Sequence, residues 1–67
     1  MNINSIEELG EYVRKTRKKQ HFTQSDIAGA CGVGVRFIVD LEKGKKTCEI
    51  GKALQVIHAL GLKINIE

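Results

Sequence analysis

The chain has 67 residues, with 11 Lys or Arg, 8 Asp or Glu and a formal net charge of +3 at pH 7. This length allows one domain that buries only about 60% of its surface, and it excludes a barrel, a doubly wound sheet or a deep substrate cleft. Two cysteines and no apolar run of about 18 residues exclude a disulfide-dense secreted domain and a membrane span. Residues 1–12 lack a signal peptide's pattern, so we expect a cytoplasmic protein with reduced thiols.

The first predicted element is a helix from about Ile6 to Lys19. Ser5 and Glu8 have the spacing of a capping box, in which the hydroxyl and the carboxylate each accept from a free backbone amide. Leu9 and Val13 fall on one face of this helix. Its acidic residues come early and its basic residues late, which suits the helix dipole.

Two short helices joined by a tight turn are predicted next, over residues 24–30 and 35–42. Thr23 and Asp26 resemble a second cap, Gly32 breaks the first of these helices, and Gly44 follows the second. Two short helices with such a turn form a helix-turn-helix. Its inward positions are apolar or small: Ile27, Ala28, Cys31, Val33, Ile38 and Leu41.

A fourth helix is predicted from about Cys48 to Leu60, with Gly61 as its stop signal. The residues expected to face inward are Ile50, Ala53, Leu54, Ile57 and Leu60. The last six residues, 62–67, alternate strictly between apolar and polar, which is the period of a strand. The apolar face of that strand comprises Leu62, Ile64 and Ile66.

The helix-turn-helix pattern resembles the Cro/phage-repressor (XRE) family of regulators. The resemblance covers about residues 6–61 and rests on Phe22-Thr23-Gln24, Ile27-Ala28, Gly32-Val33, Ile38, Leu41-Glu42-Lys43-Gly44 and Ala59-Leu60-Gly61. Within the family, RFIVDLEKGK and LQVIHALGL are similar to the HipB-like antitoxins, the DNA-binding halves of toxin–antitoxin pairs whose toxin is a HipA-type kinase.

The resemblance implies an all-α fold, a compact lambda-repressor-like bundle of four to five helices. It further implies a helix-turn-helix DNA-binding domain over residues 1–61 and a short C-terminal β-strand over 62–67 that pairs across a dimer. It also implies a structural ion pair between Arg17 and Glu42.

In such a motif the third helix lies in the major groove of duplex DNA. The outward positions are Gly34, Val35, Arg36, Val39 and Asp40. The guanidinium of Arg36 suits guanine, whereas the two valines suit a thymine methyl or a sugar. Asp40 could accept from cytosine, although a carboxylate near phosphates is disfavoured. Gly34 departs from the family's capping Ser or Thr and allows close backbone approach.

Phe37, also in the third helix, has two interpretations. We favour partial burial in the core over a wedge between bases.

The expected phosphate contacts flank the third helix. Gln24 and Ser25 open the second helix, whose free amides attract anions, and the family's Gln also buttresses the recognition helix. Lys43, Lys45 and Lys46 follow the third helix, where the family's loop meets the DNA backbone. The alternative for each of these residues is a solvated role without DNA contact.

The C-terminal strand gives a reason to dimerise. A lone strand at the end of a helical bundle leaves an open edge, which an identical strand can cover. Leu62, Ile64 and Ile66 would then close on the fourth helices. The alternative is pairing within one chain, with residues 1–4.

No metal site, cofactor or catalytic residue is expected. His21, Cys31, Cys48 and His58 do not have the spacing of zinc ligands. No nucleophile motif or Gly-rich phosphate loop is present, so we do not expect an enzyme.

The sequence therefore predicts a homodimeric repressor that binds a palindromic operator on the bacterial nucleoid. The HipB-like resemblance implies an antitoxin that regulates its own operon and neutralises a HipA-like kinase toxin, with no membrane partner. Two alternatives stay open. One is a stand-alone phage or metabolic regulator of the XRE type, and the other is a protein-interaction module that has lost DNA binding.

Overall fold

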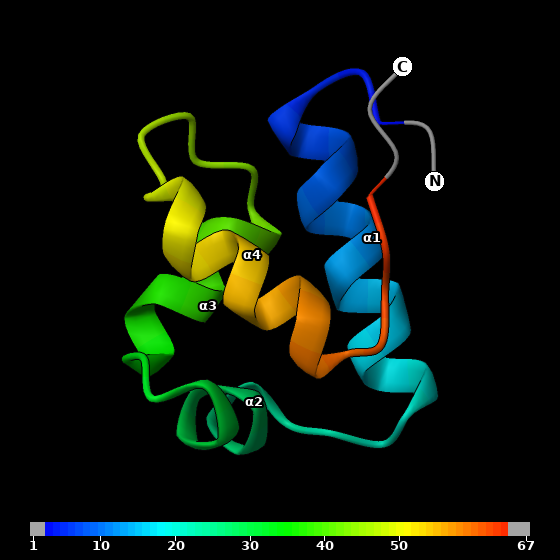
Figure 1. Ribbon diagram of the computed structural model, residues 1–67, viewed down its shortest axis with the longest axis vertical. Coiled ribbons are helices and arrows are strands. Elements are labelled where there is room, and N and C mark those ends of the chain that lie inside the picture. The colour runs from blue at the N-terminus through cyan, green and yellow to red at the C-terminus, as the bar shows by residue number, and fades with distance from the viewer. Residues whose placement is uncertain (1–2, 65–67) are drawn as a thin grey trace.

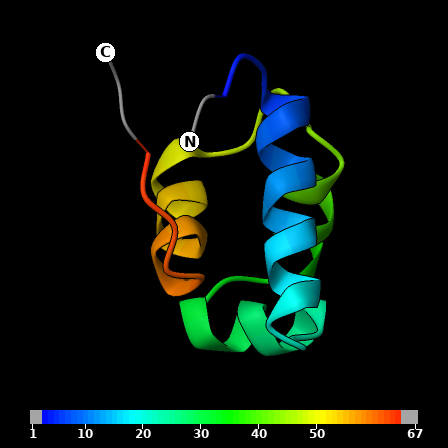
Figure 2. The same ribbon diagram turned by 90° about the vertical axis from the view of Figure 1, so that its right-hand side faces the viewer.

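Four helices make up the protein in a computed structural model that describes residues 3–64. They are α1 (Ile6–Lys19), α2 (Gln24–Cys31), α3 (Val35–Glu42) and α4 (Ile50–Ala59). In Figures 1 and 2, α2 lies across one end of the molecule, and Figure 2 shows α1 and α4 rising from it on opposite sides. Helix α3 packs on both α1 and α2. The predicted all-α helix-turn-helix bundle is confirmed.

Side-chain caps start the first two helices. The Thr23 hydroxyl accepts from the Asp26 backbone N–H at 3.0 Å, and the Asp26 carboxylate accepts from the Thr23 N–H at 2.8 Å. The Thr23 backbone N–H and then its hydroxyl hold the pKa of Asp26 below its usual value. Ser5 accepts from the Glu8 N–H as predicted, but the Glu8 carboxylate accepts from the N–H of Asn4.

Two glycines in the left-handed region place the ends of α3. Gly32, with φ of 68°, closes the turn between α2 and α3, where the Val33 N–H donates to the Ala28 carbonyl. Gly44, with φ of 78°, follows α3, and a Cβ there would lie 2.7 Å from the Cα of Glu7. The loop after α3 is therefore held close against the start of α1.

The core lies where α3 meets the other helices. Ile38 and Leu41 of α3 are fully buried against residues of α1, α2 and α4. Gly10 lets α1 approach α3, because a Cβ at this position would overlap the Leu41 carbonyl oxygen. This packing fixes which face of α3 points away from the protein.

A buried ion pair joins α1 to α3. The Arg17 guanidinium donates to the Glu42 carboxylate from Nε at 2.6 Å and from Nη2 at 3.1 Å. Its Nη1 donates to the Phe22 carbonyl at 2.8 Å. The pair implied by the family resemblance is present, and both side chains are nearly inaccessible to solvent.

The predicted inward face of α4 is partly wrong. Ile50 is 63% exposed and Leu54 39% exposed, whereas Val56 is fully buried. The stripe formed by Ala53, Val56, Ile57 and Leu60 follows the i, i+3, i+4, i+7 spacing and suffices to cover the core. The helix is also shorter than predicted, because Glu49 is its N-cap and Leu60 its C-cap.

The predicted C-terminal strand is not formed over residues 62–64, the part of it that the structure describes. Leu62 and Ile64 are partly buried and pack against the core of their own chain. A strand needs a second strand for its backbone hydrogen bonds, and a single chain supplies none to this segment among residues 3–64. Ile66, the third residue of the predicted apolar face, lies outside the described residues.

Candidate nucleic-acid interface

Helix α3 presents one face to solvent while the other is fully buried. Gly34 is its N-cap and makes no side-chain capping bond, as expected for a glycine. Val35 and Arg36 in its first turn are exposed, and the Arg36 side chain is 84% exposed. Val39, one turn later, is half-buried. The outward residues predicted from the sequence thus share the face of α3 that points away from the core.

Phe37 is half-buried and packs against the hydrophobic core. Its ring therefore contributes to anchoring α3 and is not free to insert between bases without leaving that position.

Asp40 lies between two cations on this face. Its Oδ1 is 3.4 Å from Arg36 Nε, and its Oδ2 accepts from Lys45 Nζ at 3.4 Å. The Asp40 side chain is largely covered, unlike both partners. The sequence analysis missed this arrangement, although the i, i+4 spacing of Arg36 and Asp40 is the signal for such a pair.

Gln24 connects the start of α2 to the end of α3. Its Nε2 donates to Glu42 Oε1 at 3.1 Å, the same carboxylate that Arg17 holds. Ser25, next in α2, is exposed. Gln24 therefore buttresses α3, one of the two roles that the family resemblance implies for it.

The basic loop after α3 is exposed at Lys43, Lys45 and Lys46. Lys45 is tied to α3 by its backbone as well, since its N–H donates to the Asp40 carbonyl at 3.0 Å.

Burial and then the Asp40 charge raise the pKa of Cys48, which follows this loop, so its thiol is protonated at neutral pH.

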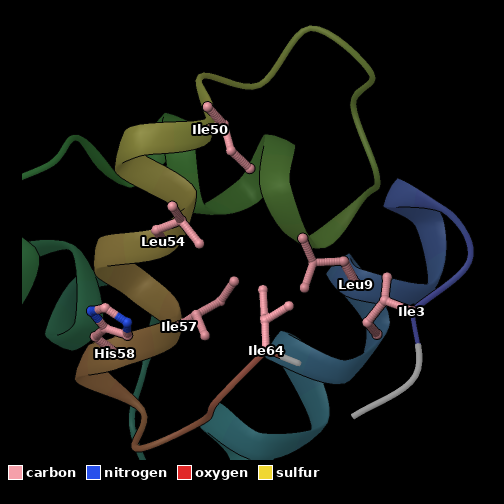
Figure 3. A pocket seen from close by; sticks show the side chains of 7 residues that line it. All are labelled: Ile3, Leu9, Ile50, Leu54, Ile57, His58 and Ile64. Atoms are coloured by element: carbon pink, nitrogen blue, oxygen red, sulfur yellow. The ribbon is translucent and has the colours of Figure 1, made fainter. Parts of the chain in front are cut away.

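A second surface is apolar. A groove of about 410 Å³ is lined by residues of α1, α4 and the segments before α1 and after α4: Ile3, Leu9, Ile50, Leu54, Ile57, His58 and Ile64. Figure 3 shows the apolar side chains around it, with the His58 ring set apart from them. Ile50 and Leu54, which the sequence analysis predicted to face the core, are exposed and lie here. An apolar pattern on α4 too wide for one stripe could have indicated this second face.

The residues weighed as zinc ligands give no cluster. Among residues 3–64, no three His, Cys, Asp or Glu side chains are placed to hold one metal ion. In that same part of the chain, every helix is too short or too polar to cross a bilayer.

Comparison with known protein families identifies the family of the chain. A family model described as helix-turn-helix (HTH_3) matches residues 13–66. The chain belongs to the helix-turn-helix family. A curated helix-turn-helix relative from Sinorhizobium fredii (strain NBRC 101917 / NGR234), the uncharacterized HTH-type transcriptional regulator y4mF, is 52% identical over 64 residues. The match covers 96% of this chain and 84% of the relative. The predicted resemblance to XRE-type regulators is confirmed.

Solved structures of helix-turn-helix proteins share the whole architecture. A HipB–O4 20mer complex and a HipA–HipB–O2–O3 complex each contain a chain that superposes with a TM-score of 0.90. Each match covers 98% of this chain and 93% of the other, at 20% sequence identity. At that identity the likeness is one of fold alone.

Proposed function

We propose that this helix-turn-helix DNA-binding regulator is a repressor that inserts α3 into the major groove and reads sequence with Arg36. The observation that carries the proposal is the outward placement of Arg36 in the first turn of a helix whose opposite face is fully buried. The first residues of the recognition helix are those that reach base edges, and bidentate contact from Arg to guanine is the commonest specific contact.

The residues around Arg36 have supporting roles in this proposal. Gly34 lets the backbone approach the DNA, and Val35 and Val39 contact a thymine methyl or a sugar. The phosphate contacts are expected at the start of α2 and in the loop after α3. These residues are Gln24, Ser25, Lys43, Lys45 and Lys46.

We further propose that two copies of the chain pair through the apolar groove and the C-terminal segment, residues 62–67. Ile64 belongs to both, and the groove offers Leu54, an exposed leucine that one chain leaves uncovered. Burial of a leucine or isoleucine stabilises by about 1.5–3 kcal/mol before ordering costs. A two-fold dimer places two α3 helices about 34 Å apart, which is one turn of DNA.

The dimer predicts both an oligomeric state and the form of the operator. The protein is expected to sediment as a dimer and to enrich, from random duplexes, two inverted copies of a short motif centred one helical turn apart. Leu54→Ser and deletion of residues 62–67 are each expected to give monomers that enrich single motifs weakly, because both remove apolar surface from the pairing face.

Tyr12→Ser is the matched control for this experiment, because Tyr12 is 43% exposed, close to the 39% of Leu54, and lies outside the groove. It is expected to leave the dimer intact. Intact dimers of Leu54→Ser and of the deletion variant would contradict the proposed interface. A wild-type protein that enriches no sequence would contradict the proposal that it is a sequence-specific repressor.

We also propose that the repressor is the antitoxin of a HipA-like kinase toxin, acting on its own operon in the cytoplasm. The support is the likeness of fold to chains of a HipB–O4 20mer complex and of a HipA–HipB–O2–O3 complex. Two observations test this. The reading frame beside the gene is expected to encode a kinase-like protein, and that protein is expected to co-purify with the chain at a fixed mass ratio. A neighbour without kinase motifs would instead leave a stand-alone regulator.

A further inference from the structure

The carboxylate of Asp40 lies between the two cations that the proposed function brings to DNA. Its Oδ1 is 3.4 Å from Arg36 Nε, and its Oδ2 is 3.4 Å from Lys45 Nζ. The side chain of Asp40 is only 18% exposed, whereas that of Arg36 is 84% exposed. The acid is therefore covered while the guanidinium that it holds remains accessible.

Helix energetics does not account for this pair. Arg36 lies in the first turn of α3 and Asp40 in the last, so each charge is at the end that the helix dipole disfavours. An acid placed before a base is the better order at i, i+4 spacing, and here the order is reversed. An ion pair whose arginine side chain is 84% exposed contributes little to stability. Residues that oppose local preferences are expected at functional positions.

The geometry suits guanine recognition. When Asp40 engages the Nε of Arg36, the two terminal amino groups of the guanidinium stay free, and such a fork can donate to guanine O6 and N7 together. A side chain held in place before binding loses less conformational entropy on binding. With both Asp40 oxygens facing cations, this role replaces the contact to cytosine considered from the sequence.

Lys45 is restrained by the same residue. Its backbone N–H donates to the Asp40 carbonyl at 3.0 Å while its Nζ lies beside the Asp40 carboxylate. Asp40 thus fixes the position of a phosphate-contacting lysine relative to the base-reading arginine.

We propose that Asp40 is a specificity-determining positioning residue: it orients Arg36 toward guanine, and its charge penalises complexes in which Arg36 finds no guanine. This inference rests on the proposed function. In the proposed complex the negative charge of Asp40 adds repulsion from the DNA phosphates at any site, and the bidentate contact of Arg36 to guanine compensates for it only at the correct base.

The test is a comparison of the wild type, Asp40→Asn, Arg36→Ala and the double variant on the selected operator and on an unrelated duplex of equal length. Asp40→Asn keeps the shape of the side chain and removes its charge. We expect its ratio of specific to non-specific affinity to fall about five- to tenfold, mainly because non-specific binding tightens and guanine preference weakens. In the Arg36→Ala background, Asp40→Asn is expected to change guanine preference no further.

Two measurements separate this role from a structural one. Thermal unfolding identifies any variant that fails to fold. Asp40→Glu keeps the negative charge, so its ratio of specific to non-specific affinity is expected to lie between those of Asp40→Asn and the wild type. The assignment of Asp40 is overturned, without affecting the proposed function, by either of two results. One is a folded Asp40→Asn variant that retains the wild-type ratio of specific to non-specific affinity. The other is an equal loss of that ratio when Asp40→Asn is made in the Arg36→Ala background. A wild type that enriches no sequence overturns the proposed function as well.

Discussion

Arg17→Met is expected to lower the free energy of unfolding by about 3–5 kcal/mol, because it leaves the buried Glu42 carboxylate without its counter-ion. The guanidinium makes three hydrogen bonds, two to Glu42 and one to the Phe22 carbonyl, and all of them are lost together. For a domain of this size, that loss is a large share of the total stability. Urea denaturation followed by circular dichroism measures it.

Arg14→Met is the control for this prediction, since Arg14 lies on the same helix and is exposed. It is expected to change stability by no more than about 0.5 kcal/mol. Adding Glu42→Leu to Arg17→Met is expected to recover much of the loss, because the uncompensated charge is removed. A loss below about 1 kcal/mol for Arg17→Met would show that the pair is not sealed from water.

The affinity for the selected operator is expected to fall about 10³-fold or more between 50 and 200 mM salt. The reason is that binding releases the counterions of the contacted phosphates. Each subunit of the proposed dimer brings the three exposed lysines of the basic loop and the N-terminus of α2 to the DNA, so the dimer contacts six or more phosphates. Fluorescence anisotropy of a labelled duplex at several salt concentrations gives the slope. The control is Lys15→Met on α1, which is exposed and assigned neither to the DNA-binding face nor to the pairing face, and it is expected to keep that slope.

A weak salt response would contradict the phosphate assignments of the lysines. Lys46→Met removes one phosphate contact from each subunit of the dimer, so it is expected to reduce the slope by about two units. Sequence preference is expected to stay unchanged, because a lysine on a phosphate carries no sequence information.

The sequence predicts the ends of three helices closely, because each end is set by local chemistry. Thr23 and Asp26 cap α2 within three residues of each other, and Gly32 and Gly44 adopt the left-handed conformation that their neighbours require. The Arg17–Glu42 pair spans 25 positions and is found through the family resemblance, not through spacing.

What the sequence does not predict depends on several elements meeting in space. Ile50 and Leu54 follow the helical period, yet they lie on a flank of α4 that no further element among residues 3–64 covers. Lys45 reaches Asp40 only because the loop after α3 turns back at Gly44. In the same way, the strand predicted over residues 62–67 needs a partner strand, and residues 3–64 of the single chain supply none.

The measurement that tests the central claim most directly is the same salt titration repeated with Arg36→Ala on the selected operator and on a version with one guanine pair replaced. The account predicts that Arg36→Ala loses about 1–3 kcal/mol per half-site of the operator, binds both duplexes almost equally, and changes the salt slope by no more than about one unit per subunit. An Arg36→Ala variant that still prefers the operator as strongly as the wild type would contradict the placement of α3 in the major groove with Arg36 at the bases.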